Sequence, residues 1–220
     1  PDSRRGYRFG SVEVRDHMQF DGLWDPYDNV AMGHCGEVCA TENQFTREAQ
    51  DEYAMQSYQR AQAAIKRGAF DSQIVAVDAK QGRKEVRVER DEEPFNLDFE
   101  RMIKLKPAFA PDGTITAANA SSINDGAALL VACSRDFCEK HNLRAIAKIV
   151  SHASYAHEPK YFTTAPVNSI RAALTKAKLK LEDIDLFEIN EAFSVVPMYA
   201  MKQLGLSSER VNINGGAVAL

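Results

Sequence analysis

The chain has 220 residues, of which 45% are hydrophobic and 26% charged, and its formal net charge is −4. This composition supplies an ordinary globular core, and no apolar run reaches the roughly 20 residues that a membrane-spanning helix needs. A negative net charge argues against nucleic-acid binding, which depends on clustered lysine and arginine. We therefore expect neither a membrane span nor a nucleic-acid partner.

In the first half of the chain, the clearest helix runs from an N-cap at Thr46 to a stop at Gly68. Its apolar residues, among them Ala54 and Tyr58, fall on one face. Strands are predicted at residues 74–77 and 85–89, and the segment 91–111, which is charged and rich in prolines, is expected to be irregular.

The second half alternates short apolar runs with helical patterns, which is typical of an α/β fold. Helices are predicted from Ser134 to His141, from about Pro166 onward, and from Phe193 to Gly205. Strands are predicted at four apolar runs, namely 127–132, 146–154, 184–189 and 211–214. No internal repeat is visible.

The sequence contains four unevenly spaced cysteines, namely Cys35, Cys39, Cys133 and Cys138. They are too few for a disulfide framework, so we expect free thiols and a cytoplasmic location. We interpret Cys39 as helix packing and expect the last two cysteines to be buried. The chain begins with proline and ends on an apolar run, so we expect truncation at both ends, with any targeting peptide outside the sequence.

The segment Glu188-Ile189-Asn190-Glu191-Ala192-Phe193 places two carboxylates and an amide where a strand meets a helix. The carboxyl ends of strands line the ligand crevice of open α/β sheets, and an amide there can hold a water by donating and accepting at once. The alternative is that Asn190 caps the following helix.

This segment, the segment from Thr116 to Ala127 and the ending Asn212-Ile213-Asn214-Gly215-Gly216-Ala217 together resemble thiolase sequences in order and separation. Further similarity lies in 104–109 and in Met32-Gly33 followed by Glu37. The resemblance covers nearly the whole chain. It implies an α/β fold of the thiolase-like layered α-β-α kind, partial, with an inserted loop domain.

The resemblance divides the chain into three parts. Residues 1–121 would form most of the CoA-binding loop domain, and residues 122–143 the last strand and helix of the N-terminal thiolase half. Residues 144–220 would form the first part of the C-terminal half. Because thiolases are dimers or tetramers, the full-length protein is expected to be a homodimer or homotetramer.

The resemblance implies a CoA-dependent acyltransferase of fatty acid and lipid metabolism, which condenses acetyl-CoA or splits 3-ketoacyl-CoA. CoA thioesters are then substrates, and no cofactor is expected. The nucleophilic cysteine would lie upstream of Pro1, and a Gly-His-Pro segment and a second cysteine would follow Leu220. The chain alone is therefore expected to be inactive.

By resemblance, the Asn190 side chain orients a water that stabilises negative charge on a thioester carbonyl oxygen. The resemblance also implies contacts with the CoA thioester from eight residues: Met32, Lys104, Lys106, Phe109, Ala117, Ala120, Ser121 and Phe193. The alternative for Phe193 is ordinary helix packing, and the alternative for the two lysines is a solvated loop.

Two metal hypotheses arise from the sequence. Tyr58 with the backbone of Ala117, Ala118 and Ala120 resembles the potassium site of one thiolase subgroup. A second set is His34, Cys35 and Cys39, but these residues lack a fourth ligand, so no metal is expected there. Cys35 is also disfavoured as the nucleophile, because adjacent helix residues do not face each other.

The sequence departs from the family pattern at Ala31, where many thiolases have histidine. Two rival functions stay open, namely a non-catalytic acyl-CoA binding module and a ketoacyl-synthase-like condensing enzyme. Asn190 argues against both, since a pure binder needs no water-orienting amide and ketoacyl synthases have histidine there. A Rossmann site is disfavoured by the spacing around Gly215-Gly216.

Overall fold

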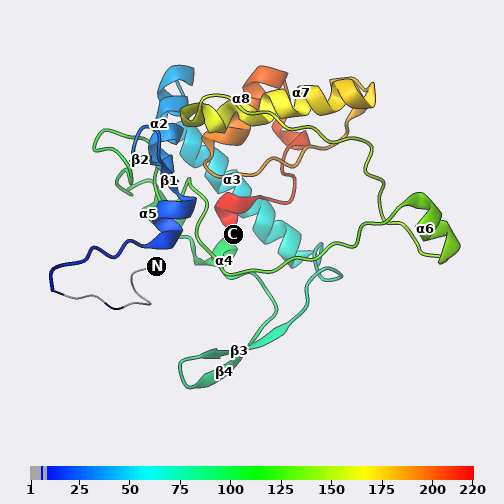
Figure 1. Cartoon of the computed structure of the whole chain (residues 1–220), viewed down its shortest axis with the longest axis horizontal. Helices are drawn as coiled ribbons and strands as arrows, with labels where there is room; N and C mark the ends of the chain where they lie inside the picture. Colours follow the sequence, from blue (N-terminus) through cyan, green and yellow to red (C-terminus); the bar gives the residue numbers. More distant parts are fainter. Residues whose placement is uncertain (1–5, 7–8) are drawn as a thin grey trace.

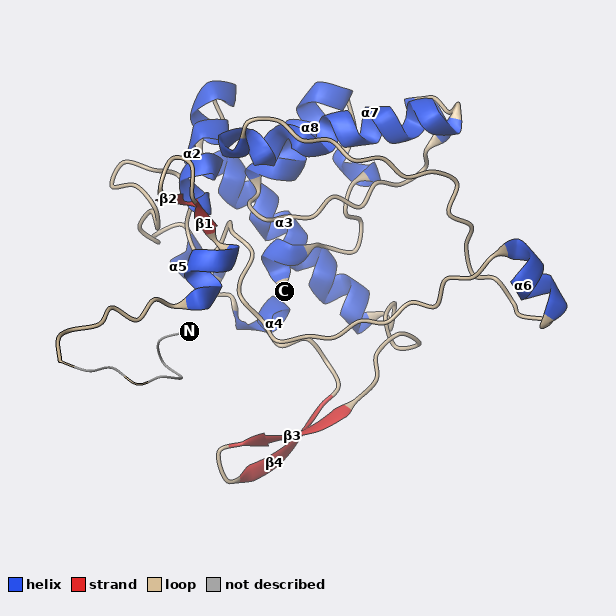
Figure 2. Cartoon of the chain, viewed as in Figure 1, coloured by secondary structure: helices blue, strands red, loops and turns tan. Residues whose placement is uncertain are grey.

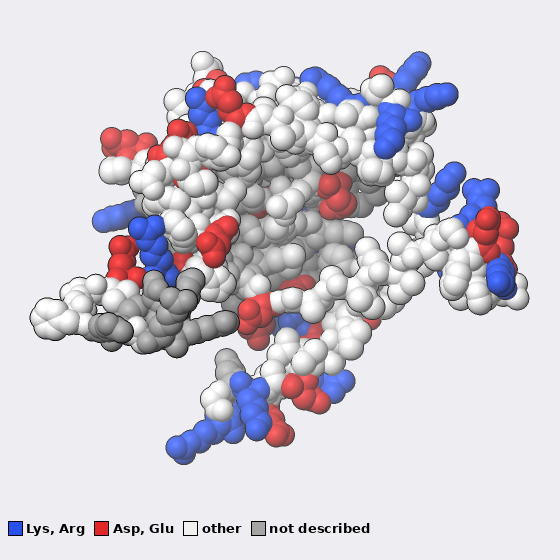
Figure 3. Space-filling view, viewed as in Figure 1, with Lys and Arg blue, Asp and Glu red and all other residues white. Residues whose placement is uncertain are grey.

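The computed structural model describes residues 6 and 9–220, and most of its helices gather in one body (Figure 1). The hairpin of strands β3 (Val77–Gln81) and β4 (Lys84–Val88), helix α6 (Arg135–Lys140) and residues 9–17 extend away from this body (Figure 2). Charged side chains of both signs lie around the margin of the face seen in Figure 3, and the middle of that face is mostly uncharged. Within the described ranges, every helix is too short or too polar to cross a membrane.

Two helices form the frame of the first half, α2 (Met32–Asn43) and α3 (Arg47–Lys66). The start of α3 is confirmed at Thr46, whose Oγ1 accepts a hydrogen bond of 3.2 Å from the Ala49 N–H. Ala54 and Tyr58 are buried along α3, as the apolar pattern predicts. Before α2 lie the short π-helix η1 (Met18–Gly22) and the paired strands β1 (Trp24–Asp25) and β2 (Val30–Ala31).

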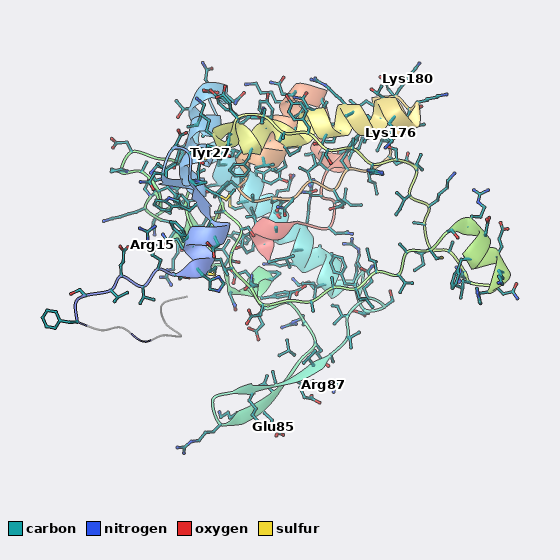
Figure 4. The ribbon with its side chains drawn as sticks, in the orientation of Figure 1. Arg15, Tyr27, Glu85, Arg87, Lys176 and Lys180 are labelled. Atoms are coloured by element: carbon teal, nitrogen blue, oxygen red, sulfur yellow. The ribbon has the colours of Figure 1, made fainter. Side chains whose placement is uncertain are left out.

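The antiparallel hairpin of β3 (Val77–Gln81) and β4 (Lys84–Val88) confirms the second of the two strands predicted here. The first was wrong in position, because a two-residue turn at Gly82, with φ +65°, pairs Val77 with Val88 and leaves earlier residues without a partner. Figure 4 shows Glu85 and Arg87 on this hairpin, away from the helical body. The segment predicted to be irregular contains two single-turn helices, α4 (Glu93–Asn96) and α5 (Phe99–Met102).

The predicted strands at 127–132 and 146–154 are wrong. These segments are extended but unpaired, and the side chains of Leu129, Leu130 and Val131 are 86–96% exposed. A strand forms only where its backbone groups pair with a neighbour, and none of the described strands runs beside them. The helix between them, α6 (Arg135–Lys140), is confirmed, with Ser134 as its N-cap.

In the second half, helices α7 (Ala165–Ala177) and α8 (Val195–Leu204) are confirmed, with Pro166 in the first turn of α7. The predicted strands at 184–189 and 211–214 shrink to isolated bridges, of which the parallel pair Phe187 and Val211 is the main one. The remaining helices are single 3-10 segments: η2 (Pro159–Thr164), η3 (Leu181–Asp183), η4 (Ser208–Arg210) and η5 (Ala217–Ala219).

Two buried clusters hold these elements together. One joins α2, α8 and the bridged segments around Phe193, Ile189 and Val211. The other joins α3 to the C-terminal residues Val218 and Ala219. Figure 1 shows the C-terminal η5, in red, beside α3, and the two elements are in contact. The candidate site lies where these two clusters meet.

Candidate functional site

Asn190 is exposed between two buried neighbours, Ile189 and Glu191, which are 7% and 0% exposed. The N-cap of α8 is Ser194, and the first N–H groups of that helix receive no side-chain cap. The alternative that Asn190 merely caps the next helix is therefore wrong. The exposed Asn190 therefore stands between two residues that are buried in the fold.

The backbone before Asn190 is held by the side chain of Asn212, which acts in place of a neighbouring strand. Asn212 Oδ1 accepts a hydrogen bond from the Ile189 N–H, and Asn212 Nδ2 donates to the Ile189 carbonyl, each at 2.8 Å. Asn212 adopts a left-handed φ of 46°, a conformation that asparagine tolerates better than most residues. Its motif was noticed in the sequence, but this role was not predicted.

On the other side of Asn190, the Glu191 carboxylate accepts four hydrogen bonds. Oε1 accepts from the Tyr53 hydroxyl at 2.7 Å and from Asn212 Nδ2 at 2.8 Å. Oε2 accepts from the Ser57 hydroxyl at 2.8 Å and from the Val218 N–H at 3.1 Å. All four donors are neutral, so hydrogen bonds rather than an ion pair stabilise the buried carboxylate.

The Glu191 carboxylate raises the pKa values of two neighbouring groups, Tyr53 and Glu188. Burial and the charge of Glu191 raise the pKa of Tyr53, which therefore stays protonated and acts as a donor. Burial, and then Glu191, also raise the pKa of Glu188. Sequence reasoning missed the role of Glu191, because a carboxylate beside a strand end gives no sign of being fully buried.

An aromatic wall lies next to this network. The ring centroids of Phe109 and Phe193 are 6.0 Å apart in an edge-to-face arrangement, and the Phe162 ring is 6.5 Å from Phe193. A Cβ placed on Gly33 of α2 would lie 2.2 Å from the Phe109 ring, so the ring rests directly on that helix. Met32, at the start of α2, is half-buried beside this contact.

The segment before residue 122 is tied to the same wall. Ala120 forms an antiparallel bridge with Phe193, and the Ser121 N–H donates to the Ala192 carbonyl at 3.1 Å. The structure thus brings together four residues predicted to contact CoA, although about seventy positions separate the two segments. Asn119, which was not predicted, supports the turn by accepting from the Thr116 N–H at 2.8 Å.

The carboxylate of Glu37 on α2 holds the preceding loop. It accepts hydrogen bonds from the Thr114 N–H and the Ile115 N–H at 2.9 Å each, and from the Thr114 hydroxyl at 3.0 Å. These bonds fix the loop that carries Phe109 against α2. Glu37 therefore holds this loop through hydrogen bonds to its carboxylate, as Glu191 holds the C-terminal segment.

The family models decide the identity of the fold. A model described as the thiolase N-terminal domain matches residues 1–136, and one described as the thiolase C-terminal domain matches residues 143–220. The chain belongs to the thiolase family. The resemblance seen in the sequence is thereby confirmed, while the finer division at residues 121 and 143 stays a prediction.

Individual thiolases support this result. The acetyl-CoA acetyltransferase of Yarrowia lipolytica is 47% identical over 218 residues, which are 99% of this chain and 55% of that protein. The chain thus spans about half the length of the curated relatives it matches. At 43% identity, one relative from Gibberella zeae is named as cytosolic and one from Bos taurus as mitochondrial.

Solved thiolase structures superpose closely on the chain. Acetyl-CoA acetyltransferase of Bacillus anthracis gives a TM-score of 0.92 at 40% identity and covers 100% of this chain, which covers 56% of that structure. Acat5 thiolase of Ascaris suum, in complex with coenzyme A, gives 0.89 at 43% identity over 98% of this chain and 56% of its own. These similarities confirm the predicted thiolase-like α/β fold.

The remaining predicted thiolase residues lie outside the aromatic wall. Lys104, Lys106 and Ala117 are exposed. Tyr58 is buried in the same cluster as Ala118, and its hydroxyl donates to Glu93 at 3.3 Å. The potassium site therefore stays a hypothesis. Within the described residues, no group of three or more His, Cys, Asp and Glu side chains is arranged to hold a metal ion.

The cysteines of this thiolase lie in different environments. Cys35 is 2% exposed, and burial, followed by the nearby charges of Asp25 and Asp28, raises the pKa of its thiol. A nucleophilic cysteine needs a lowered pKa, so Cys35 is unsuited to the role. Cys39 is buried in packing as predicted, whereas the predicted burial of Cys133 is wrong because its segment has no covering strand.

Cys138 is only half-buried, so the expectation of burial is not met there either. Its thiol donates to the Leu143 carbonyl at 3.0 Å, just beyond the end of α6. This hydrogen bond closes the turn that follows α6 and engages the thiol as a donor.

Proposed function

We propose that this chain is part of an acetyl-CoA acetyltransferase that condenses two acetyl-CoA molecules or splits a 3-ketoacyl-CoA. The observation that carries the proposal is the exposed Asn190 amide, held between the buried residues Ile189 and Glu191. It lies three positions before Phe193, which forms part of the aromatic wall. Further support comes from relatives that are named acetyl-CoA acetyltransferases.

In the proposed reaction, a cysteine carries the acyl group and a second cysteine removes a proton from the α-carbon of acetyl-CoA. The resulting carbanion attacks the acyl thioester carbonyl, a carbon–carbon bond forms, and the cysteine thiolate leaves. Asn190 would hold a water that donates to the thioester oxygen as negative charge develops there. Oriented donors of this kind are commonly worth about 3 kcal/mol.

The substrate would lie along the residues assembled around the aromatic wall. Phe109 and Phe193 would line the channel of the pantetheine arm, and Ser121, Ala117 and Ala120 would form its small-residue floor. The exposed Lys104 and Lys106 would meet the anionic end of CoA. The two reacting cysteines would lie outside these 220 residues, since the chain spans about half of its relatives.

The proposal extends to the setting of the enzyme. We assign it to lipid metabolism in the cytoplasm, as a homodimer or homotetramer with CoA thioesters as substrates and no separate cofactor. A potassium ion bound by Tyr58 and the carbonyls of Ala117, Ala118 and Ala120 is retained as a hypothesis. Crystals of the full-length protein soaked in rubidium test this hypothesis, and the absence of anomalous density at this position would refute it.

The test uses the full-length protein that contains this chain, assayed for thiolysis of acetoacetyl-CoA. Asn190→Ala should lower kcat by roughly 100-fold and leave KM nearly unchanged, because the amide acts on charge that forms in the transition state. Asn96→Ala, at another exposed asparagine, is the matched control. Equal activities of the two variants would refute the role of Asn190, and CoA binding without any turnover would favour the acyl-CoA binding module.

A further inference from the structure

We propose that Glu191 is a positioning residue, whose buried carboxylate sets the direction of the Asn190 amide by tying three chain segments together. The proposal rests on the proposed function of Asn190. Glu191 is adjacent to Asn190 in sequence but opposite in environment, since its side chain is fully buried while Asn190 is exposed.

The first step is the convergence of distant segments on one carboxylate. Tyr53 and Ser57 come from α3, more than 130 positions before Glu191. Asn212 and Val218 come from the C-terminal segment. Each carboxylate oxygen accepts two hydrogen bonds, so the usual acceptor capacity of the group is filled.

The second step is a relay that extends this contact. The Ser57 hydroxyl donates to Glu191 and accepts from the Gly216 N–H at 3.0 Å. A Cβ on Gly216 would lie 2.4 Å from the Glu191 carboxyl carbon, so the backbone passes directly over the carboxylate. The C-terminal segment is therefore fixed by its backbone to both α3 and Glu191.

The third step links this network to Asn190. Asn212 donates to Glu191 and also bonds both backbone groups of Ile189. The Ile189 backbone before Asn190 and the Glu191 side chain after it are thus held by the same side-chain network. A preorganised amide costs little reorganisation during the reaction, and a displacement of about 1 Å can cost roughly 100-fold in rate.

Glu191→Gln tests the hydrogen-bond network sharply, because it keeps the size of the side chain but replaces one acceptor by an NH₂ donor. If the NH₂ takes the place of Oε1, it faces the NH₂ of Asn212. If it takes the place of Oε2, it faces the N–H of Val218. In either orientation two hydrogen-bond donors face each other without an acceptor between them. The hydroxyls of Tyr53 and Ser57 do not cause this conflict, because they can rotate to accept.

We therefore expect Glu191→Gln in the full-length protein to lower kcat by roughly 10- to 100-fold, with KM changed by less than about threefold. Tyr53→Phe removes one of four donors and should lower kcat by only about three- to tenfold. It serves as the second variant if Glu191→Gln fails to fold. Glu37→Gln, at the carboxylate that holds the Phe109 loop, is the matched control and should act mainly on KM.

Hydrogen exchange measured on the full-length protein provides a readout that does not need catalysis. Glu191→Gln and Tyr53→Phe should speed exchange at the Gly216 and Val218 amides by about tenfold or more, while Glu37→Gln should leave these two amides unchanged. Unchanged exchange in the first two variants would overturn the proposed positioning network.

The kinetic results separate this proposal from the one on which it rests. If Asn190→Ala loses activity but Glu191→Gln and Tyr53→Phe retain full kcat, the positioning role is refuted and the role of Asn190 stands. If Asn190→Ala retains activity, the proposed function of Asn190 is refuted, and with it the catalytic meaning of the network. Loss of kcat in all three variants, with KM preserved, supports both.

Discussion

Gly216→Ala is the substitution that probes the packing over Glu191 most directly. The backbone at Gly216 has φ −150°, which any residue adopts, so the substitution adds no backbone strain. The new Cβ would lie 2.4 Å from the carboxyl carbon of Glu191 and 2.6 Å from each of its oxygens. Either the C-terminal segment or the carboxylate must move.

The magnitude of this effect follows from two contributions. Overpacking of a buried site costs about 1–3 kcal/mol, and weakening a hydrogen bond to a buried charged group costs about 1.5–3 kcal/mol. Because the segment can relax, we expect a total loss of about 2–4 kcal/mol in the free energy of unfolding. For a chain of this length, that loss lowers Tm by about 4–16 °C.

Thermal and urea denaturation followed by far-UV circular dichroism measure this loss. Gly22→Ala is the matched control, because a Cβ there meets nothing within 4 Å. It should change stability by less than about 0.5 kcal/mol. If Gly216→Ala were as stable as Gly22→Ala, the close approach of the backbone to Glu191 would be refuted.

Three further predictions concern packing, capping and thiol chemistry. Phe193→Ala should lower the free energy of unfolding in urea by about 3–5 kcal/mol, since Phe193 is only 8% exposed, and a loss below about 1 kcal/mol would contradict its place in the core. Thr46→Ala should cost about 1 kcal/mol, whereas Ser134→Ala, with the same cap geometry on the outlying α6, should leave the main unfolding transition unchanged. Iodoacetamide at pH 8 should label exposed Cys133 well before Cys35, whose raised pKa keeps it a neutral thiol as pH rises; equal labelling rates would contradict the burial of Cys35.

The helices were predictable because their signals are local. Thr46 and Ser134 accept the hydrogen bonds expected of N-caps, and α8 ends at Gly205. Most of the strands were not predictable, because strand pairing depends on segments far away in sequence; the local β3–β4 hairpin is the exception. The apolar runs around Leu130 and Ile149 have the pattern of buried strands, yet they stay unpaired among the described residues.

The candidate site was predictable only in part. Similarity to thiolases pointed to Phe109, Ser121 and Phe193, which the fold does bring together. The roles of Glu191 and Asn212 could not be predicted, because burial of a carboxylate depends on donors from α3 that no local pattern reveals. Asn212 gave a weak signal, since it lies in a motif shared with thiolases.

A crystal structure of the full-length protein with a bound acyl-CoA tests the central claim most directly, namely that Asn190 faces the substrate while Glu191 holds the frame behind it. We predict a water within about 3 Å of both the Asn190 amide and the thioester oxygen, with the four donors still on Glu191. An Asn190 side chain turned onto the α8 backbone, with no water between it and the thioester, would contradict the account.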